Sequence, residues 1–110
     1  MPAGVILLTI AYLTLMVAVQ GLLMINELIG KNVVVDMRST FVCLGKLHRI
    51  DEQHLELLDA DIHDLRDTQT TRENYVIDSR LTGIKRNRKK VFIVRADIIA
   101  ISMLDDVVES

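Results

Sequence analysis

The sequence has little of what stabilises or equips many small proteins. Cys43 is its single cysteine, so an intrachain disulfide is excluded, and no Cys/His cluster has the spacing of a zinc site. The chain contains no internal repeat, no phosphate-binding loop, no Ser-His-Asp order and no evident pair of catalytic carboxylates. The net charge is only −2, which gives the chain as a whole no attraction for nucleic acid. We therefore predict no enzyme, no cofactor and no metal site.

The first part of the chain also lacks charge. Residues 2–25 contain no Asp, Glu, Lys or Arg, and every charged side chain lies from Glu27 onward. About 20 apolar residues span a bilayer, so this segment is long enough to be a membrane anchor. The nearby Lys31 and Arg38 would then keep the rest of the chain in the cytoplasm. A basic n-region and a small-residue cleavage site are missing, which argues against a cleaved secretory signal.

A second interpretation of the same segment stays open. Met24 opens MINELIGKNVVV, a normal-looking start for a small domain, so the assigned start could be too early. Both interpretations divide the chain in the same place. Residues 1–23 are an apolar segment, either a membrane anchor or a mis-assigned start, and residues 24–110 are one domain.

The residues after Met24 predict a β-rich domain. A short helical pattern runs over 24–29, and Gly30 can end it. Strands are then predicted at 32–38, 39–50, 53–64, 89–95 and 97–104. Gly45 interrupts the second strand, which indicates a bulge or a sharp bend.

A helix is predicted between the third and fourth strands. Thr70 and Glu73 have the spacing of a capping box, and Gly83 suits the residue after a helix. The helix is therefore expected over 71–82. A helix, three strands, an inserted helix and two more strands indicate a small closed barrel.

Two motifs within these strands resemble those of the Sm/LSm family of RNA-binding ring proteins. The first family motif is a strand, a glycine and an Asp six residues later. It is matched by VVVDMRSTFVCLGKLHRIDEQHLELLDAD, at Gly45, Leu47, Asp51 and Leu58. The second is an apolar strand that ends in Arg-Gly, followed by Ile-x-x-Ile. It is matched by VFIVRADIIAI, at Arg95, Ile98 and Ile101. The resemblance covers residues 24–106. With its inserted helix and the basic run that ends the insert, the chain resembles a bacterial branch of Sm-like proteins.

The resemblance implies a five-stranded Sm-like (SH3-like) antiparallel barrel with an N-terminal helix, and a homo-oligomeric ring that binds single-stranded RNA. In the family, Arg95 would lie in a tight turn facing the pore, where its planar guanidinium can stack on a base and donate hydrogen bonds. The fourth and fifth strands would offer open edges that neighbouring subunits pair. A different interpretation of Arg95 is an intersubunit salt bridge with Asp51 or Asp97.

The loop of the first motif departs from the family pattern. Gln53 takes the stacking position, His54 the position of a Met, and Leu55 the position of the Asn that hydrogen-bonds the uracil edge. Glu52 adds negative charge, and Ala96 replaces a glycine. We take Asp51, Gln53, His54 and Arg95 as the candidate inner site, while a half-buried histidine at a strand end is the plainer interpretation of His54.

The densest basic run adds candidates for phosphate contact, namely Lys85, Arg86, Arg88, Lys89 and Lys90. Its alternative is a solvated loop balanced by an acidic stretch of a neighbouring subunit. Asp59, Asp61 and His63 alternate and could share one face of a strand, where a polar outer face explains them better than a metal. Cys43 is expected in the core.

We therefore predict non-catalytic RNA binding by a cytoplasmic ring. The competing hypothesis is a protein-interaction scaffold with the same fold that no longer binds RNA, either as the ring alone or as a membrane-tethered version of it. Leu55 and Glu52 favour the scaffold, whereas Arg95 and the basic run favour RNA binding.

Overall fold

The computed structural model describes residues 2–67 and 69–109, with side chains throughout these ranges except in 18–23. The elements are α1 (Ala3–Asn26), β1 (Asn32–Met37), β2 (Phe41–Ile50), β3 (His54–Asp64), η1 (Leu65–Asp67), α2 (Arg72–Thr82), β4 (Arg88–Val94), η2 (Arg95–Asp97), β5 (Ile98–Met103) and η3 (Leu104–Asp106). The strands form one sheet in the order β4-β3-β2-β1-β5, and every neighbouring pair is antiparallel. The predicted succession of helix, three strands, inserted helix and two strands is confirmed.

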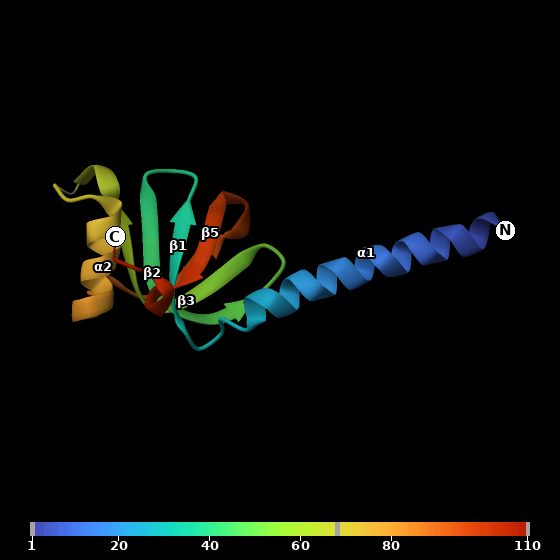
Figure 1. Ribbon diagram of the computed structural model, residues 1–110, viewed down its shortest axis with the longest axis horizontal. Helices are drawn as coiled ribbons and strands as arrows, with labels where there is room; N and C mark the ends of the chain where they lie inside the picture. The colour runs from blue at the N-terminus through green and yellow to red at the C-terminus, as the bar shows by residue number, and fades with distance from the viewer. Residues whose placement is uncertain (1, 68, 110) are drawn as a thin grey trace.

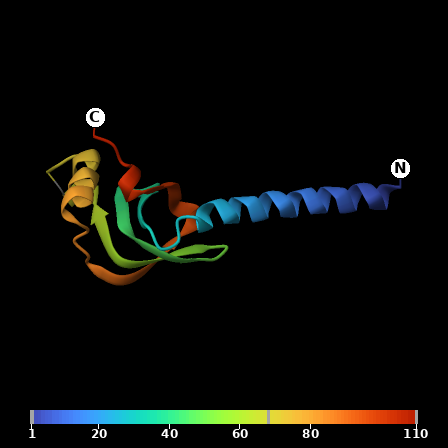
Figure 2. The ribbon, with the colours of Figure 1, turned by 60° about the horizontal axis from the view of Figure 1, so that its bottom comes forward.

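α1 is one continuous helix that extends away from the strands (Figures 1 and 2). The boundary predicted between residues 23 and 24 falls inside it, and the short helix predicted over 24–29 is its last turn and the turns that follow. No Pro or Gly interrupts 22–26, so nothing in the sequence breaks the helix there. Ile25 and Leu28 anchor this end of the helix against the barrel core.

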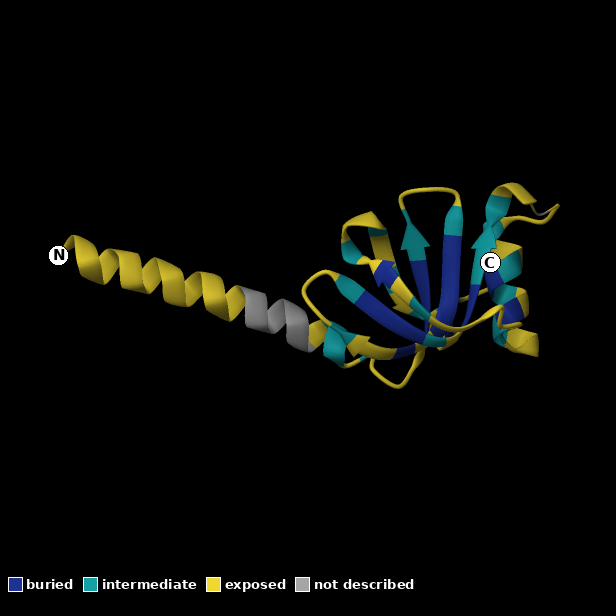
Figure 3. Cartoon of the chain, turned by 180° about the vertical axis from the view of Figure 1, so that it is seen from behind, coloured by how far each residue is buried: buried dark blue, intermediate teal, exposed yellow. Residues whose placement is uncertain are grey.

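The other end of α1 is exposed. From residue 2 to residue 17 every side chain is exposed, including Leu7, Leu8 and Leu13 (Figure 3). Within 2–17, 24–67 and 69–109, no helix is long and apolar enough to cross a membrane. The anchor expected over residues 2–25 includes 18–23, which lie outside those ranges.

The sheet is buried on both of its faces near β1 and β2. One core cluster fills the barrel and is made of Val33, Val35, Cys43, Leu47, Leu55, Leu57, Ala60 and Ile93. A second cluster lies on the opposite face, where Val34, Val42 and Leu44 pack against Val76 of α2 and Leu104 of η3. The uninterrupted apolar run at 33–35 thus reflects a strand that is covered on both sides. Cys43 is fully buried as predicted, and burial raises the pKa of its thiol to about 12.

The inserted helix begins one residue later than the capping-box pattern indicated. The N-cap is Thr71 rather than Thr70, and its hydroxyl accepts a hydrogen bond from the Asn74 backbone N–H at 3.1 Å. Gly83 follows the last turn with a φ of 99°, a conformation that L side chains rarely adopt. α2 lies against the strands at the side of the barrel away from α1 (Figure 1).

The bend predicted at Gly45 is present. The pairing of β2 with β3 shifts register between Leu44 and Lys46, so Gly45 lies at this irregularity. A Cβ placed on Gly45 would lie 3.0 Å from the Cβ of Ala60 and 3.2 Å from its Cα. Only a residue without a side chain allows β2 and β3 to approach this closely at the bend.

Candidate nucleic-acid interface

The two turns of the matched motifs meet at one end of the barrel. The Arg95 backbone N–H donates to the Gln53 carbonyl at 2.8 Å, and the Arg95 guanidinium donates through Nη1 to the Asp51 carbonyl at 2.7 Å. Residues 42 to 44 positions apart in the chain are thereby joined. η2, which holds Arg95, lies between β4 and β5, so the break in VFIVRADIIAI is the turn that carries this contact.

Asp51 shapes the turn between β2 and β3. Its Oδ1 accepts hydrogen bonds from the backbone N–H groups of Gln53, at 2.8 Å, and His54, at 2.6 Å. These two bonds, together with the nearby His54 ring, hold the pKa of the Asp51 carboxyl below its ordinary value. The carboxylate is therefore charged and organises its own loop, while its side chain stays 69% exposed.

The predicted inner-site residues surround this turn. Gln53 is exposed, and its side chain makes no hydrogen bond to any other described residue. His54 is partly exposed; its Nδ1 lies 3.5 Å from Asp51 Oδ1, and its ring meets Phe92 edge-on with centroids 6.5 Å apart. Arg95 is half-buried. The structure thus places these four residues at two turns that are joined by hydrogen bonds.

Two hollows open at the turn. One, of about 410 Å³, is lined by Asp51, Glu52, Gln53 and His54. The other, of about 300 Å³, is lined by Arg49, Ile50, Asp51, His54, Glu56 and Phe92. Both share Asp51 and His54, so the hollows together are lined by a carboxylate, an imidazole and, from Phe92, an aromatic ring.

Arg95 was expected to contact RNA or to form an intersubunit salt bridge, and neither expectation included a contact within its own chain. The guanidinium binds the backbone carbonyl of Asp51 rather than a carboxylate, so it fixes one turn to the other. Nη1 is used in this way, and the other N–H groups of the fork donate to no other residue in the described part of the chain. No sequence signal distinguishes a carbonyl partner from a carboxylate, because both lie at Asp51.

Leu55 explains one departure from the family loop. It is 2% exposed and belongs to the barrel core, where it pairs with Ile50 and Ile93. It is the first inward-facing residue of β3, so it cannot present an edge to a base. Any hydrogen bond from a side chain of this loop to a base therefore depends on Gln53 and His54.

The basic run lies elsewhere. Arg88 pairs with Ala60 and Val94 pairs with His54, so the run and the Arg95 turn are at opposite ends of β4. At ~3.3 Å per residue the two ends are about 20 Å apart. Within the chain, Arg86 pairs with Asp59 at 2.5 Å and Lys90 pairs with Glu56 at 3.2 Å.

A buried carboxylate beside the turn was not predicted from the sequence. Glu56 is 3% exposed and accepts from Arg49 Nε at 2.5 Å, with His48 Nδ1 at 3.2 Å and Lys90 Nζ at 3.2 Å. The hydrogen bonds from Arg49, and then those from Lys90 and His48, lower the pKa of Glu56 to about 2. A signal was available, because Glu56 is directly opposite Arg49 in the β-ladder, where opposite charges attract.

The alternating triplet on β3 does not form one site. Asp59 has a φ of 48° at the bulge and pairs with Arg86, whereas Asp61 is buried and accepts from the Tyr75 hydroxyl. The His63 ring stacks on Tyr75 with centroids 4.3 Å apart. Among the described residues no group of three or more His, Cys, Asp or Glu could hold a metal ion.

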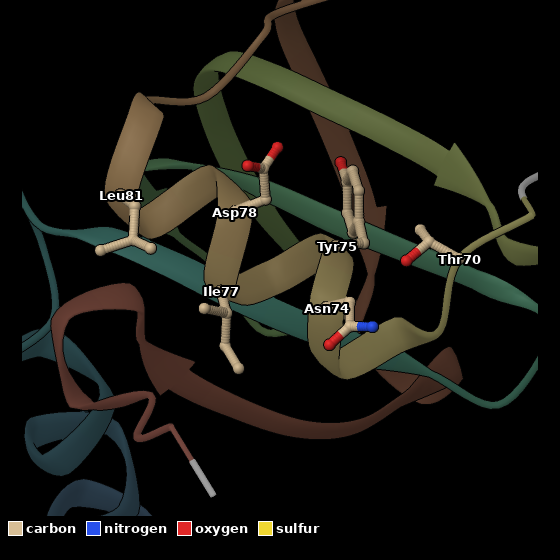
Figure 4. Close-up of a pocket in the computed structure, with 6 residues that line it drawn as sticks. All are labelled: Thr70, Asn74, Tyr75, Ile77, Asp78 and Leu81. Carbon is tan, nitrogen blue, oxygen red and sulfur yellow. The ribbon is translucent and has the colours of Figure 1, made fainter.

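A further hollow of about 490 Å³ runs along α2 and is lined by Thr70, Asn74, Tyr75, Ile77, Asp78 and Leu81 (Figure 4). It lies along the inserted helix and shares no residue with the two hollows at the turn. We therefore treat it as separate from the candidate interface.

The fold is similar to those of solved Sm proteins. A Pyrococcus abyssii Sm protein in complex with a uridine heptamer aligns with a TM-score of 0.52 and 21% identity, over 74% of this chain and 94% of that one. An Sm-like protein from Archaeoglobus fulgidus, AF-Sm2, aligns with a TM-score of 0.50 and 17% identity, over 73% of this chain and 88% of that one. No family model and no curated protein sequence matches the chain. The five antiparallel strands with their N-terminal and inserted helices are an Sm-like fold.

Proposed function

We propose that this protein forms a homo-oligomeric ring that binds single-stranded RNA without catalysing a reaction. The observation that carries the proposal is the junction of the two turns, where Arg95 is bonded to the backbone of a loop that exposes Gln53 and His54. The similar fold of an Sm protein that holds a uridine heptamer supports the same assignment.

Each side chain has a distinct role in this proposal. Arg95 would place its guanidinium plane on a base or donate to a phosphate, because one nitrogen already holds it in position. The Gln53 amide has a donor and an acceptor for a base edge, and the His54 ring offers a stacking surface. Asp51 acts indirectly, since its carboxylate is occupied by the loop's own N–H groups.

The two sheet edges support the ring. β4 and β5 are the outermost strands of the sheet, and they expose large apolar side chains: Phe92 (58%), Val94 (46%) and Ile99 (66%). Exposed apolar edge strands promote aggregation unless another strand covers them. Pairing of β4 with β5 of the next subunit would cover both edges and close a ring.

Gln53→Ala is the sharpest test of the RNA site. It removes a side chain without touching the loop's hydrogen bonds, which use the Gln53 backbone. We expect the affinity for fluorescent oligouridine, measured by anisotropy on the full chain in mild detergent, to fall about 5- to 10-fold. Arg95→Ala should cost about 10- to 100-fold, as for a lost stacking partner.

The matched control is Arg66→Ala. Arg66 is an exposed arginine that pairs with Asp64, and its charge lies outside both hollows at the turn. Native mass spectrometry of each variant must show the wild-type oligomer. Unchanged oligouridine affinity in both Gln53→Ala and Arg95→Ala would remove the site from this turn.

α1 favours a second function, a scaffold tethered to a lipid surface. Its exposed apolar side chains over 2–17 have no partner among the described residues, and a helix that is apolar all round is normally buried in protein or lipid. The full chain should then float with phosphatidylcholine vesicles, and Leu8→Asp with Leu13→Asp should abolish flotation. A discrete ring that floats but has no affinity for oligouridine would replace the RNA-binding proposal with the scaffold. The cytoplasmic location stays a prediction, as does the assignment of residues 1–23 to a membrane anchor or a mis-assigned start.

A further inference from the structure

The two edge strands of the sheet carry opposite charge, with positive charge at the start of β4 and negative charge after the end of β5. β4 begins within the basic run, 85–90, whereas β5 is followed at once by Asp105 and Asp106 in η3. β4 and β5 are separated by three strands in the sheet order. The basic run and the acidic turn therefore belong to opposite edges of one subunit.

Neither group is fully neutralised within the described part of its own chain. Arg86 and Lys90 have carboxylate partners, but Lys85, Arg88 and Lys89 form no ion pair there. Asp105 and Asp106 are exposed and likewise have no cation within 4 Å among the described residues. Each edge thus presents unpaired charge of one sign.

Both groups are held in place by the fold. Lys89 belongs to β4, which pairs with β3 from Arg88 to Val94. On the other edge, Leu104 is 4% exposed in the second core, and the Arg80 guanidinium donates to the Val107 carbonyl. The acidic turn is thereby fixed on both sides, so its carboxylates are presented at a defined position.

We propose that the basic run of one subunit forms an electrostatic lock with Asp105 and Asp106 of a second copy of this chain. This inference rests on the proposed ring. It identifies the charges that favour one direction of pairing between β4 and the β5 of the next subunit. Antiparallel pairing of β4 with the neighbouring β5 brings the start of β4 beside the end of β5, which joins Lys89 to the acidic turn. Parallel pairing would bring the same cations beside η2, where Arg95 offsets Asp97.

The same residues were predicted to contact RNA phosphates, and the geometry favours the second copy instead. Lys90, the member of the run nearest the Arg95 turn, is five residues from Arg95, which is about 17 Å along β4 at ~3.3 Å per residue. Arg86 and Lys90 are already paired with Asp59 and Glu56, which leaves fewer cations of the run for a phosphate backbone. A neighbouring β5 would also cover the apolar side chains Phe92 and Val94 on the same strand.

The test is charge reversal with a compensating swap, on the full chain in mild detergent. Native mass spectrometry and sedimentation would compare wild type, Lys89→Glu, the double variant Asp105→Lys with Asp106→Lys, and the combination of all three. Lys46→Glu is the matched control, because Lys46 is exposed on the interior strand β2 and makes the same change in net charge.

We expect Lys89→Glu to raise the concentration for half-assembly about 5-fold or more, since an attraction becomes a repulsion. The combined variant should recover part of the lost assembly, because the reversed charge at position 89 then faces reversed charges at positions 105 and 106, and Lys46→Glu should change nothing. The effect should shrink with salt, because the Debye length falls from about 10 Å at 0.1 M to about 3 Å at 1 M. A purely structural defect would not respond to salt or to the swap.

Each other outcome overturns the lock. The lock would be refuted by Lys89→Glu rings that are as stable as wild type, or by a combined variant that stays dissociated. Neither result would refute the proposed ring of the wild-type protein. Intact Lys89→Glu rings with weaker oligouridine binding would assign the run to RNA. A monomeric wild type would refute the ring itself, so failure of the proposed function is told apart from failure of the lock.

Discussion

Gly45→Ala tests whether the bend in β2 depends on the close approach of β3. The added Cβ would lie 3.0 Å from Ala60 Cβ, 3.2 Å from Ala60 Cα and 3.2 Å from Leu57 Cδ2. Carbon atoms pack best at about 3.5–4.0 Å, so the strands must separate by several tenths of an ångström. Two of the three contacts are to the Cα and Cβ of Ala60, which move only with the backbone of β3.

The size of the effect follows from two opposing contributions. Overpacking of this kind costs about 1–3 kcal/mol. Replacing Gly by Ala restricts the unfolded chain and returns about 0.4–1 kcal/mol. The net loss in unfolding free energy should be about 1–2 kcal/mol, which lowers Tm by about 5–15 °C for a domain of this size.

Urea and thermal unfolding would measure this loss. Gly4→Ala is the control, because the same added methyl meets nothing within 4 Å. Ala60→Gly should relieve the clash, so the double variant Gly45→Ala with Ala60→Gly should be more stable than the sum of the single effects predicts. A Gly45→Ala protein as stable as wild type, or strictly additive effects, would show that the bend has another cause.

Two further predictions concern buried carboxylates. Tyr75→Phe leaves Asp61, which is 7% exposed, without its hydroxyl donor, and should lower the free energy of unfolding in urea by about 1–3 kcal/mol; an unchanged midpoint would contradict this contact. Glu56 has a folded pKa of about 2 against an ordinary 4.5, so the stability it contributes is fully present above pH 4.5 and is lost as pH falls from 4.5 toward 2. In Glu56→Gln, the urea midpoint should depend less on pH across that window. Parallel plots of urea midpoint against pH for variant and wild type would count against this prediction.

Much of the candidate site could be read from local sequence. Asp51 and Arg95 lie in turns between strands, and turn positions are marked by the break in apolar alternation. Their partners could not be read in this way. Whether Arg95 meets a carboxylate, a carbonyl or a neighbouring subunit depends on how two turns 44 residues apart are brought together by the strands between them.

The sequence alone determined the succession of elements, the glycine at the bend, the buried cysteine and the uncharged helix, because each depends on spacing within one segment. Tertiary structure decided where charges meet. Glu56 is buried beneath Arg49 and Lys90, and the basic run is at the far end of β4 from Arg95. Ladder register and strand order set those distances, and they arise only when segments far apart in the chain pair.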